Sequence, residues 1–192
     1  VSGERKGDFS LTAKYGLTSD LILDGTYNPD FSQVEADAGQ VDVNLRYALY
    51  YPEKRPFFLE GSEIYNVAAT QMSAIDPVVS VVHTRMMANP LAGGKLSGKI
   101  DAKNTIASLY VIDEIPSDEK ALSGNYSHFP IFRYKRSLAD DSYLGAIYAG
   151  RELREHFNRV AGIDGMLRMT PRSMFQFNGL YSATKTDAAS GQ

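Results

Sequence analysis

Apolar and polar residues alternate along most of this 192-residue chain, and this period of two constrains the fold more than any other feature. The alternation is most regular in residues 9–18, 41–49 and 175–182. Successive side chains of a β-strand point to opposite faces, so each of these segments predicts a strand with one apolar and one polar face. Weaker copies occur at Leu21–Tyr27, Val78–Met86, Lys95–Ile100, Thr105–Asp113, Ile131–Arg136, Tyr143–Ala149 and Arg159–Met169. Together they predict an all-β chain of about ten strands.

Short segments rich in turn-forming residues separate the predicted strands. They are Leu17–Asp20, Asn89–Gly94, Asp101–Asn104, Ala139–Ser142 and Thr170–Ser173. A longer polar loop is predicted at Glu114–Pro130, and Arg151–His156 is predicted to be a polar loop, with one helical turn as the alternative. Strands joined by short turns run antiparallel, and no intervening segment has the length or the 3.6-residue period of a crossover helix. The prediction is an antiparallel meander in one domain over residues 1–192.

Two architectures can use such a meander. A soluble sandwich or barrel would turn the apolar face inward, whereas a transmembrane β-barrel would turn it toward lipid and the polar face toward a lumen. The chain has 12 Tyr and 9 Phe, many of them near predicted strand ends, where membrane barrels carry aromatic girdles. Arg46, Asp164 and Arg168 place charge in mid-strand on the polar face, which suits a wet lumen. The absence of Trp and of a C-terminal aromatic residue argues the other way. We favour the membrane barrel or a segment of one.

Composition excludes several classes of protein and site. The net charge is −3 without long runs of either sign, so nucleic acid is not expected as a partner. The chain has no cysteine, which removes disulfide scaffolds, thiolate metal sites and cysteine nucleophiles. No apolar run approaches the ~18 residues of a membrane helix, so strands would have to make any span. The abrupt start at Val1, without the apolar core of a signal peptide, suggests a piece of something longer.

Two charged, proline-punctuated segments, residues 28–40 and 51–66, interrupt the alternation and are predicted to be lumenal or loop segments. Pro52 and Pro56 do not fit mid-sheet, so 51–57 is predicted to bend, with Phe57, Phe58 and Leu59 as an apolar anchor. Because buried charges are tolerated only when paired, we expect an ion-pair network in which Lys54 and Arg55 neutralise Glu35, Asp37 or Glu60. The candidate ligand or lumen-lining residues are Asp30, Glu35, Asp37, Arg46, Glu53, Lys54, Arg55, Glu60 and Glu63.

Other interpretations of the same residues remain open. Paired carboxylates can hydrolyse glycosides when they lie about 5–10 Å apart across a substrate, which spacing in sequence does not establish. Asp30, Glu35 and Asp37 could bind calcium, although their spacing matches no EF-hand loop. The three histidines, His83, His128 and His156, are far apart, which argues against zinc. Residues 93–98 lack the spacing of a phosphate-binding loop. We expect no metal site, no cofactor and no catalytic residue.

Two motifs, residues 28–37 and 52–61, resemble the signature of an uncharacterised bacterial envelope family. The similarity continues into His83–Met86 and residues 93–99, and it covers about residues 8–115. Members of that family usually carry an N-terminal module similar to family-nine carbohydrate-binding domains, followed by a long region that looks like an outer-membrane β-barrel. The resemblance implies that this chain is the first part of such a barrel, without the carbohydrate-binding module.

These observations predict a protein of the bacterial outer membrane that contacts lipid through its strands. It would act as a channel or surface-anchoring module for a polar ligand, with saccharide as the candidate that the resemblance implies. The alternative is a soluble β-domain that hydrolyses glycosides, with Glu35, Asp37, Glu53 or Glu60 as acid and base. Partner subunits, the ligand itself and closure of the barrel within this chain do not follow from the sequence.

Overall fold

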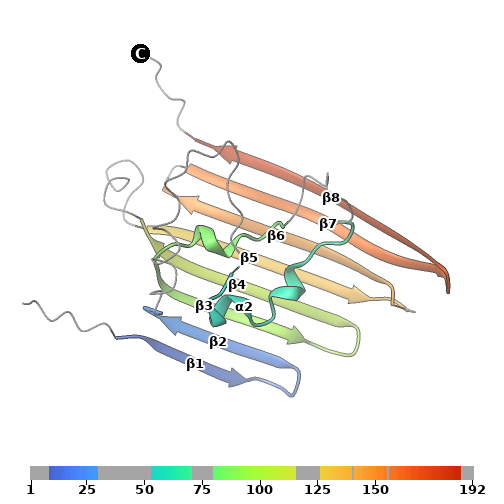
Figure 1. Ribbon diagram of the computed structural model, residues 1–192, viewed down its shortest axis with the longest axis horizontal. Helices are drawn as coiled ribbons and strands as arrows, with labels where there is room; N and C mark the ends of the chain where they lie inside the picture. The colour runs from blue at the N-terminus through green and yellow to red at the C-terminus, as the bar shows by residue number, and fades with distance from the viewer. Residues whose placement is uncertain are drawn as a thin grey trace, which may run out of the picture.

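Eight antiparallel strands form one open sheet in the computed structural model, which describes residues 9–29, 53–70, 80–115, 126–139, 141–154 and 156–186. Each strand pairs with the next along the chain, in the order β1 to β8 (Figure 1). The strands are β1 (Leu11–Gly16), β2 (Leu21–Tyr27), β3 (Pro90–Lys99), β4 (Asn104–Glu114), β5 (Tyr126–Ser137), β6 (Tyr143–Leu153), β7 (His156–Thr170) and β8 (Ser173–Lys185). The predicted antiparallel meander is therefore confirmed, with eight strands rather than ten in the described part of the chain.

The turn chemistry of the sequence sets most of the strand boundaries. The predicted turns at 17–20, 101–104, 139–142 and 170–173 all separate neighbouring strands. Asp101 illustrates the cause, because its carboxylate accepts hydrogen bonds from the backbone N–H groups of Lys103 and Asn104 and from the Asn104 side chain. The predicted strand at 41–49 lies outside the described residues.

Four local predictions are wrong. Residues 90–94 are strand rather than turn, and Gly93 makes room for a ring, because a Cβ there would lie 3.2 Å from Phe57. Residues 80–86 form no strand, and their one regular element is the 3₁₀ turn η2 (Thr84–Met86). Tyr126–Pro130 belong to β5 instead of a loop. Arg151–Leu153 and His156 extend β6 and β7, because charged residues there pair across solvated strand ends.

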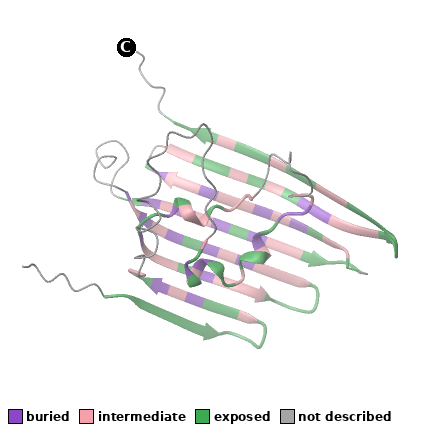
Figure 2. Ribbon diagram, in the orientation of Figure 1, coloured by how far each residue is buried: buried purple, intermediate pink, exposed green. Residues whose placement is uncertain are grey.

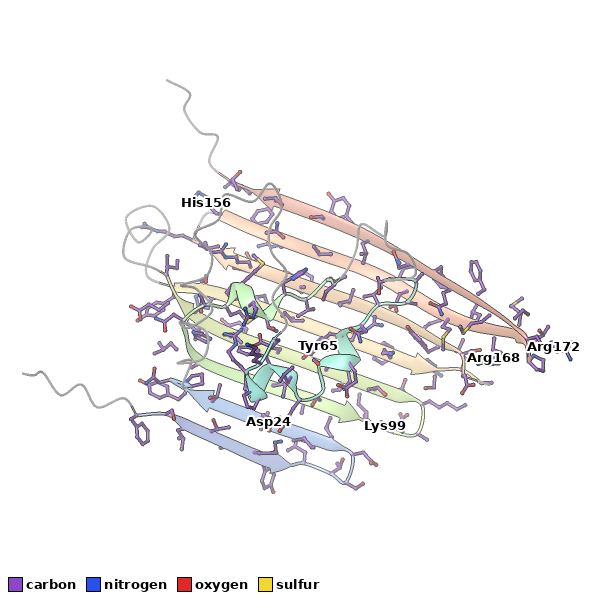
Figure 3. The ribbon with its side chains drawn as sticks, viewed as in Figure 1. Asp24, Tyr65, Lys99, His156, Arg168 and Arg172 are labelled. Atoms are coloured by element: carbon purple, nitrogen blue, oxygen red, sulfur yellow. The ribbon has the colours of Figure 1, made fainter. Side chains whose placement is uncertain are left out.

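The two ends of the sheet differ in the length of their connections. At one end, short turns join β1 to β2, β3 to β4, β5 to β6 and β7 to β8. At the other end, residues 28–89 and 115–125 connect β2 to β3 and β4 to β5, and only the β6–β7 connection is short. Lys99, Arg168 and Arg172 lie at the short-turn end, and His156 lies at the opposite end (Figure 3).

Residues 53–70 and 80–89, here called the covering segments, lie over one face of the sheet (Figure 1). They contain the helical turn α2 (Pro56–Leu59), the 3₁₀ turn η1 (Ser62–Tyr65) and η2. Phe58, Tyr65 and Met87 pack against residues of β4 and β5 in a small apolar cluster, completed by Ala107, Leu109, Val111, Phe129 and Ile131. We call this side of the sheet the covered face; its buried residues concentrate on the central strands (Figure 2).

The opposite side, the uncovered face, exposes large apolar side chains. Register places Leu23, Phe132 and Tyr181 in one row across the sheet, on the side opposite Lys95 and Leu109. Other exposed apolar residues of this face are Leu11, Tyr15, Tyr27, Tyr110, Leu144, Ile163 and Phe175. In the described part of the chain no helix is long and apolar enough to cross a membrane.

Candidate functional site

The structure describes five of the nine predicted site residues, and all five lie in the first covering segment. They are Glu53, Lys54, Arg55, Glu60 and Glu63. Asp30, Glu35, Asp37 and Arg46 lie outside the described residues. The predicted pairing of Arg55 or Lys54 with Glu35 or Asp37 is therefore not tested, but the surroundings of Arg55 and Glu60 are defined.

Arg55 ties the two covering segments together. Its guanidinium is buried and donates to both carboxylate oxygens of Glu53, at 2.8 Å from Nε and 2.7 Å from Nη2. It also donates to the carbonyl oxygens of Met87 at 2.6 Å and Thr84 at 2.7 Å, and it lies 4.2 Å from the centre of the Phe58 ring. Arg55 thereby fixes α2 against η2.

The Glu53 carboxylate is saturated with donors. Burial raises its pKa, but hydrogen bonds from the Arg55 side chain, the Thr84 hydroxyl and the Arg55 backbone N–H, together with the Arg55 charge, outweigh burial and lower the pKa to about 2. The Thr84 hydroxyl lies 2.5 Å from Glu53 Oε2. Glu53 is therefore a structural anion at neutral pH.

Lys95 of β3 holds the end of α2. Its side chain is 2% exposed, and its ammonium donates to the carbonyl oxygens of Phe57 at 2.8 Å and Glu60 at 2.9 Å. A cation near the last carbonyls of a helical turn compensates their partial negative charge. Asp24 of β2 (labelled in Figure 3) lies 3.4 Å from the same ammonium. The Glu60 carboxylate itself pairs with Lys14 of β1, rather than with the predicted Lys54 or Arg55.

A buried ion pair between β5 and β7 holds the chain that follows η1. Arg133 and Asp164 are both fully buried and make two hydrogen bonds of 2.5 and 2.8 Å. Arg133 also donates to the carbonyl oxygens of Ile64 and Asn66, and Asp164 accepts the backbone N–H of Ala68 at 2.9 Å. The pair therefore uses its remaining donors and acceptors on the backbone of the covering segment, as buried charges require.

Two side chains of β8 also hydrogen-bond to the backbone of the first covering segment. Gln176 accepts the backbone N–H of Ala69 at 3.0 Å, and Asn178 donates to the carbonyl of Ala68 at 2.9 Å. Asn178 is the register partner of Asp164, and Gln176 lies two residues before Asn178 on β8. These three polar side chains therefore lie close together on the same face of neighbouring strands. Side chains of the sheet, rather than its backbone ladder, thus satisfy the backbone of residues 64–69.

A pocket of about 580 Å³ lies beside η1 at the short-turn end of the sheet. It is lined by residues of η1, β4, β5, β6 and β7 and of the β5–β6 turn, which are Glu63, Ile64, Thr105, Lys135, Ser137, Leu138, Ala139, Asp141, Ser142, Tyr143 and Met166. Its volume is typical of small-molecule sites. Of the five predicted site residues that the structure describes, Glu63 is the one that lines it.

No group of three metal-binding side chains occurs within the described residues. Two of the three histidines lie on strands. His128 Nδ1 lies 2.8 Å from the Tyr110 hydroxyl on β4, and His156 begins β7 at the end of the sheet opposite the short turns. Neither has the surroundings of a ligand set in the described structure.

Residues 3–72 match a family model described as Domain of unknown function (DUF5916). The match includes both charged segments and runs from the N-terminal region through β1, β2, α2 and η1. No curated protein and no solved structure matches the chain. The chain is thus similar to this family over its first third, and the carbohydrate-binding relatives and the outer-membrane context remain predictions.

Proposed function

We propose that the chain forms part of the wall of a bacterial outer-membrane β-barrel, with its uncovered face toward lipid and its covered face toward the lumen. In this arrangement the covering segments are an inward-folded plug. One observation carries the proposal: the sheet buries charged side chains on one face and exposes large apolar side chains on the other.

The exposed apolar side chains argue against a wet surface. Ile163 is 62% exposed and Tyr181 73% exposed, and both stand on the face that no described segment covers. Soluble monomers rarely expose apolar patches that extend across a whole sheet. An outward apolar face with a polar inner face is the pattern of a transmembrane barrel wall.

Connection lengths and strand lengths support the same proposal. Membrane barrels have short turns at one end and longer loops at the other, which is the arrangement of this sheet. Strands β3 to β8 have 10, 11, 12, 11, 15 and 13 residues, enough for a tilted crossing of about 9–11 residues.

The proposed role is passage or docking of a polar ligand. Lys95, Arg133 and Asp164 are buried beneath the covering segments and hold them on the lumenal side of the sheet, where these segments would narrow the lumen. The family resemblance makes saccharide the candidate ligand class. Channel and surface anchor are distinguished by whether the assembled protein conducts.

Membrane extraction tests the proposal directly. The full-length protein, expressed in a Gram-negative host, is expected in the outer-membrane fraction after washing with alkaline carbonate, and in solution only with detergent. Recovery in the aqueous fraction without detergent would overturn the proposal. Discrete conductance steps in a planar bilayer would identify a channel, and their absence in a membrane-inserted protein would leave the anchoring role.

The rival proposal, a glycoside hydrolase using Glu53 or Glu60, receives less support from the geometry. A general acid must hold a proton near neutral pH, whereas hydrogen bonds and the Arg55 charge keep Glu53 ionised down to about pH 2. Glu60 is exposed and paired with Lys14. Loss of glycoside turnover in Glu53→Gln or Glu60→Gln, with folding intact, would favour the hydrolase.

A further inference from the structure

We propose that the pocket beside η1 binds an acidic saccharide unit, a sugar ring carrying one carboxylate, with the carboxylate at Lys135. This inference rests on the proposed function and deepens it, because it names a ligand class and a place for it on the lumenal side of the sheet. The site combines one cation in its wall with several hydrogen-bonding groups around it.

Lys135 is the cation that selects a carboxylate. It stands on β5 on the covered face, two residues beyond Arg133, and it is half-buried. Its ammonium lies 4.3 Å from the centre of the Tyr143 ring, and within the described ranges no carboxylate forms an ion pair with it. Asp164, the nearby buried acid, is already paired with Arg133. A ligand carboxylate would supply the missing counter-ion.

The remaining polar lining suits the hydroxyl groups of a sugar. Glu63 on η1 is exposed at the pocket, and a carboxylate is a strong acceptor for hydroxyl donors. Thr105 and Ser137 add hydroxyls that can donate or accept. Asp141 also lines the pocket but pairs with Arg168 at 3.3 Å, so its charge is balanced. Arg168 lies at the short-turn end (Figure 3).

The pocket wall is held in place before any ligand binds. The Tyr143 hydroxyl donates to Asp164 at 3.2 Å, which fixes the ring beneath Lys135. Glu63 belongs to the turn whose carbonyls at Ile64 and Asn66 accept from Arg133. Pre-formed sites lose less entropy on binding than flexible ones. The two sides of the pocket, one on the sheet and one on the covering segment, therefore share the Arg133–Asp164 pair as support.

Calorimetric titration of the full chain in detergent micelles tests the inference with three probes. Glucuronate carries both the carboxylate and the ring hydroxyls, glucose lacks the carboxylate, and lactate lacks the ring. We expect glucuronate to bind at least tenfold more tightly than either of the others. Equal affinity for glucose and glucuronate, or no binding of glucuronate at millimolar concentration, would overturn the inference.

Matched variants locate the binding. Lys135→Met should weaken glucuronate binding by about tenfold to a hundredfold, because it removes a charge-assisted hydrogen bond. Lys103→Met, on an exposed lysine in the neighbouring β3–β4 turn, should leave the affinity unchanged. Glucuronate binding by Lys135→Met at the native affinity would overturn the site.

Lys135→Gln provides a second variant if Lys135→Met does not fold. It keeps a polar side chain but removes the charge, so it should weaken glucuronate by about tenfold while leaving glucose unaffected. An unchanged glucuronate affinity in Lys135→Gln would contradict the assignment. The membrane fractionation of the same preparation separates the two proposals: a membrane-inserted chain that ignores glucuronate refutes the pocket alone, and an aqueous chain refutes the barrel proposal.

Discussion

Charged side chains are buried on the covered face of the sheet, and large apolar side chains are exposed on the uncovered face. Lys95, Arg133 and Asp164 are almost fully buried, whereas Ile163 and Tyr181, on strands β7 and β8, are among the most exposed residues of the described structure. Both sets belong to the same strands or to adjacent ones. The same alternating pattern has therefore produced two different surfaces: on one face charged side chains are buried, and on the other face apolar side chains are exposed.

The difference shows that the covering segments, rather than the sheet itself, determine which charges are buried. Three buried charges of the covered face bond to backbone of residues 53–70: Lys95 donates to Phe57, Arg133 donates to Ile64, and Asp164 accepts from Ala68. On the uncovered face no described segment offers such partners, and apolar groups take the exposed positions. If the uncovered face lies against lipid, as proposed, these apolar groups have a non-aqueous neighbour.

The largest expected effect comes from breaking the buried pair of the covered face. Asp164→Asn leaves the Arg133 guanidinium buried without a counter-ion, so we expect a loss of about 3–5 kcal/mol in the free energy of unfolding. Urea unfolding in lipid vesicles, followed by tryptic cleavage of the covering segments, measures both the loss and its location.

The matched control is the exposed pair between Glu152 and Arg159, whose side chains are 29% and 46% exposed. The pair lies near the ends of β6 and β7, where water screens it, so Glu152→Gln should cost about 0–1 kcal/mol. Similar losses from Asp164→Asn and Glu152→Gln would show that the covering segments do not depend on the buried pair.

Truncation of the apolar cluster tests the contact between sheet and covering segments. Leu109 is 2% exposed and belongs to the cluster that includes Phe58 and Met87, so Leu109→Ala should cost about 2–5 kcal/mol. Leu17→Ala, in the exposed β1–β2 turn, should change stability by no more than about 0.5 kcal/mol. Equal costs in the same urea experiment would refute a packed interface.

A charged residue introduced on the uncovered face tests whether lipid or water contacts that face. Ile163→Arg should cost about 2–4 kcal/mol in vesicles if the position lies near the middle of a bilayer. Ser182→Arg, at an exposed position of the covered face on the next strand, should stay within about 0.5 kcal/mol. Tolerance of both variants would indicate that water, not lipid, contacts Ile163.

Acid should weaken the covering segments through Glu53. Its pKa is about 2 in the folded protein and near 4.5 otherwise, so its contribution is fully present above pH 4.5 and is lost as the pH falls toward 2. Between pH 4.5 and pH 2, the Glu53→Gln variant should therefore lose on the order of 3 kcal/mol less free energy of unfolding than the native protein loses. Glu60→Gln, at the exposed pair with Lys14, should leave the acid profile nearly unchanged; a similar change in both variants would contradict the special role of Glu53.

The sequence predicted the meander well because period two and turn chemistry are local properties. Leu21–Tyr27 was predicted with the same bounds that β2 has in the structure. The prediction failed where a distant contact decides the local structure: Gly93 and Gly94 suggested a turn, but both lie in β3, and Gly93 leaves space for Phe57 of α2. Spacing along the chain carries no record of such a contact.

The site was predicted only in outline. An inward-folded charged segment was expected, and Asp164 was recognised as a mid-strand charge, but Lys95 and Arg133 were not singled out. Arg133 follows the apolar run Phe129–Phe132, in which both faces of β5 are apolar, so alternation gave no signal for its side. The i, i+2 spacing of Arg133 and Lys135 was the available clue, since it places two cations on one face of a strand.

The most direct test of the central claim is a pair of single-cysteine variants, which the cysteine-free chain permits without background labelling. Tyr181→Cys lies on the uncovered face and Ser182→Cys next to it on the covered face, both at exposed positions of β8. With a fluorescent label on each variant in vesicles of brominated lipid, we predict strong quenching at position 181 and little at 182. Equal quenching at both positions, or none at 181, would contradict a lipid-facing uncovered face.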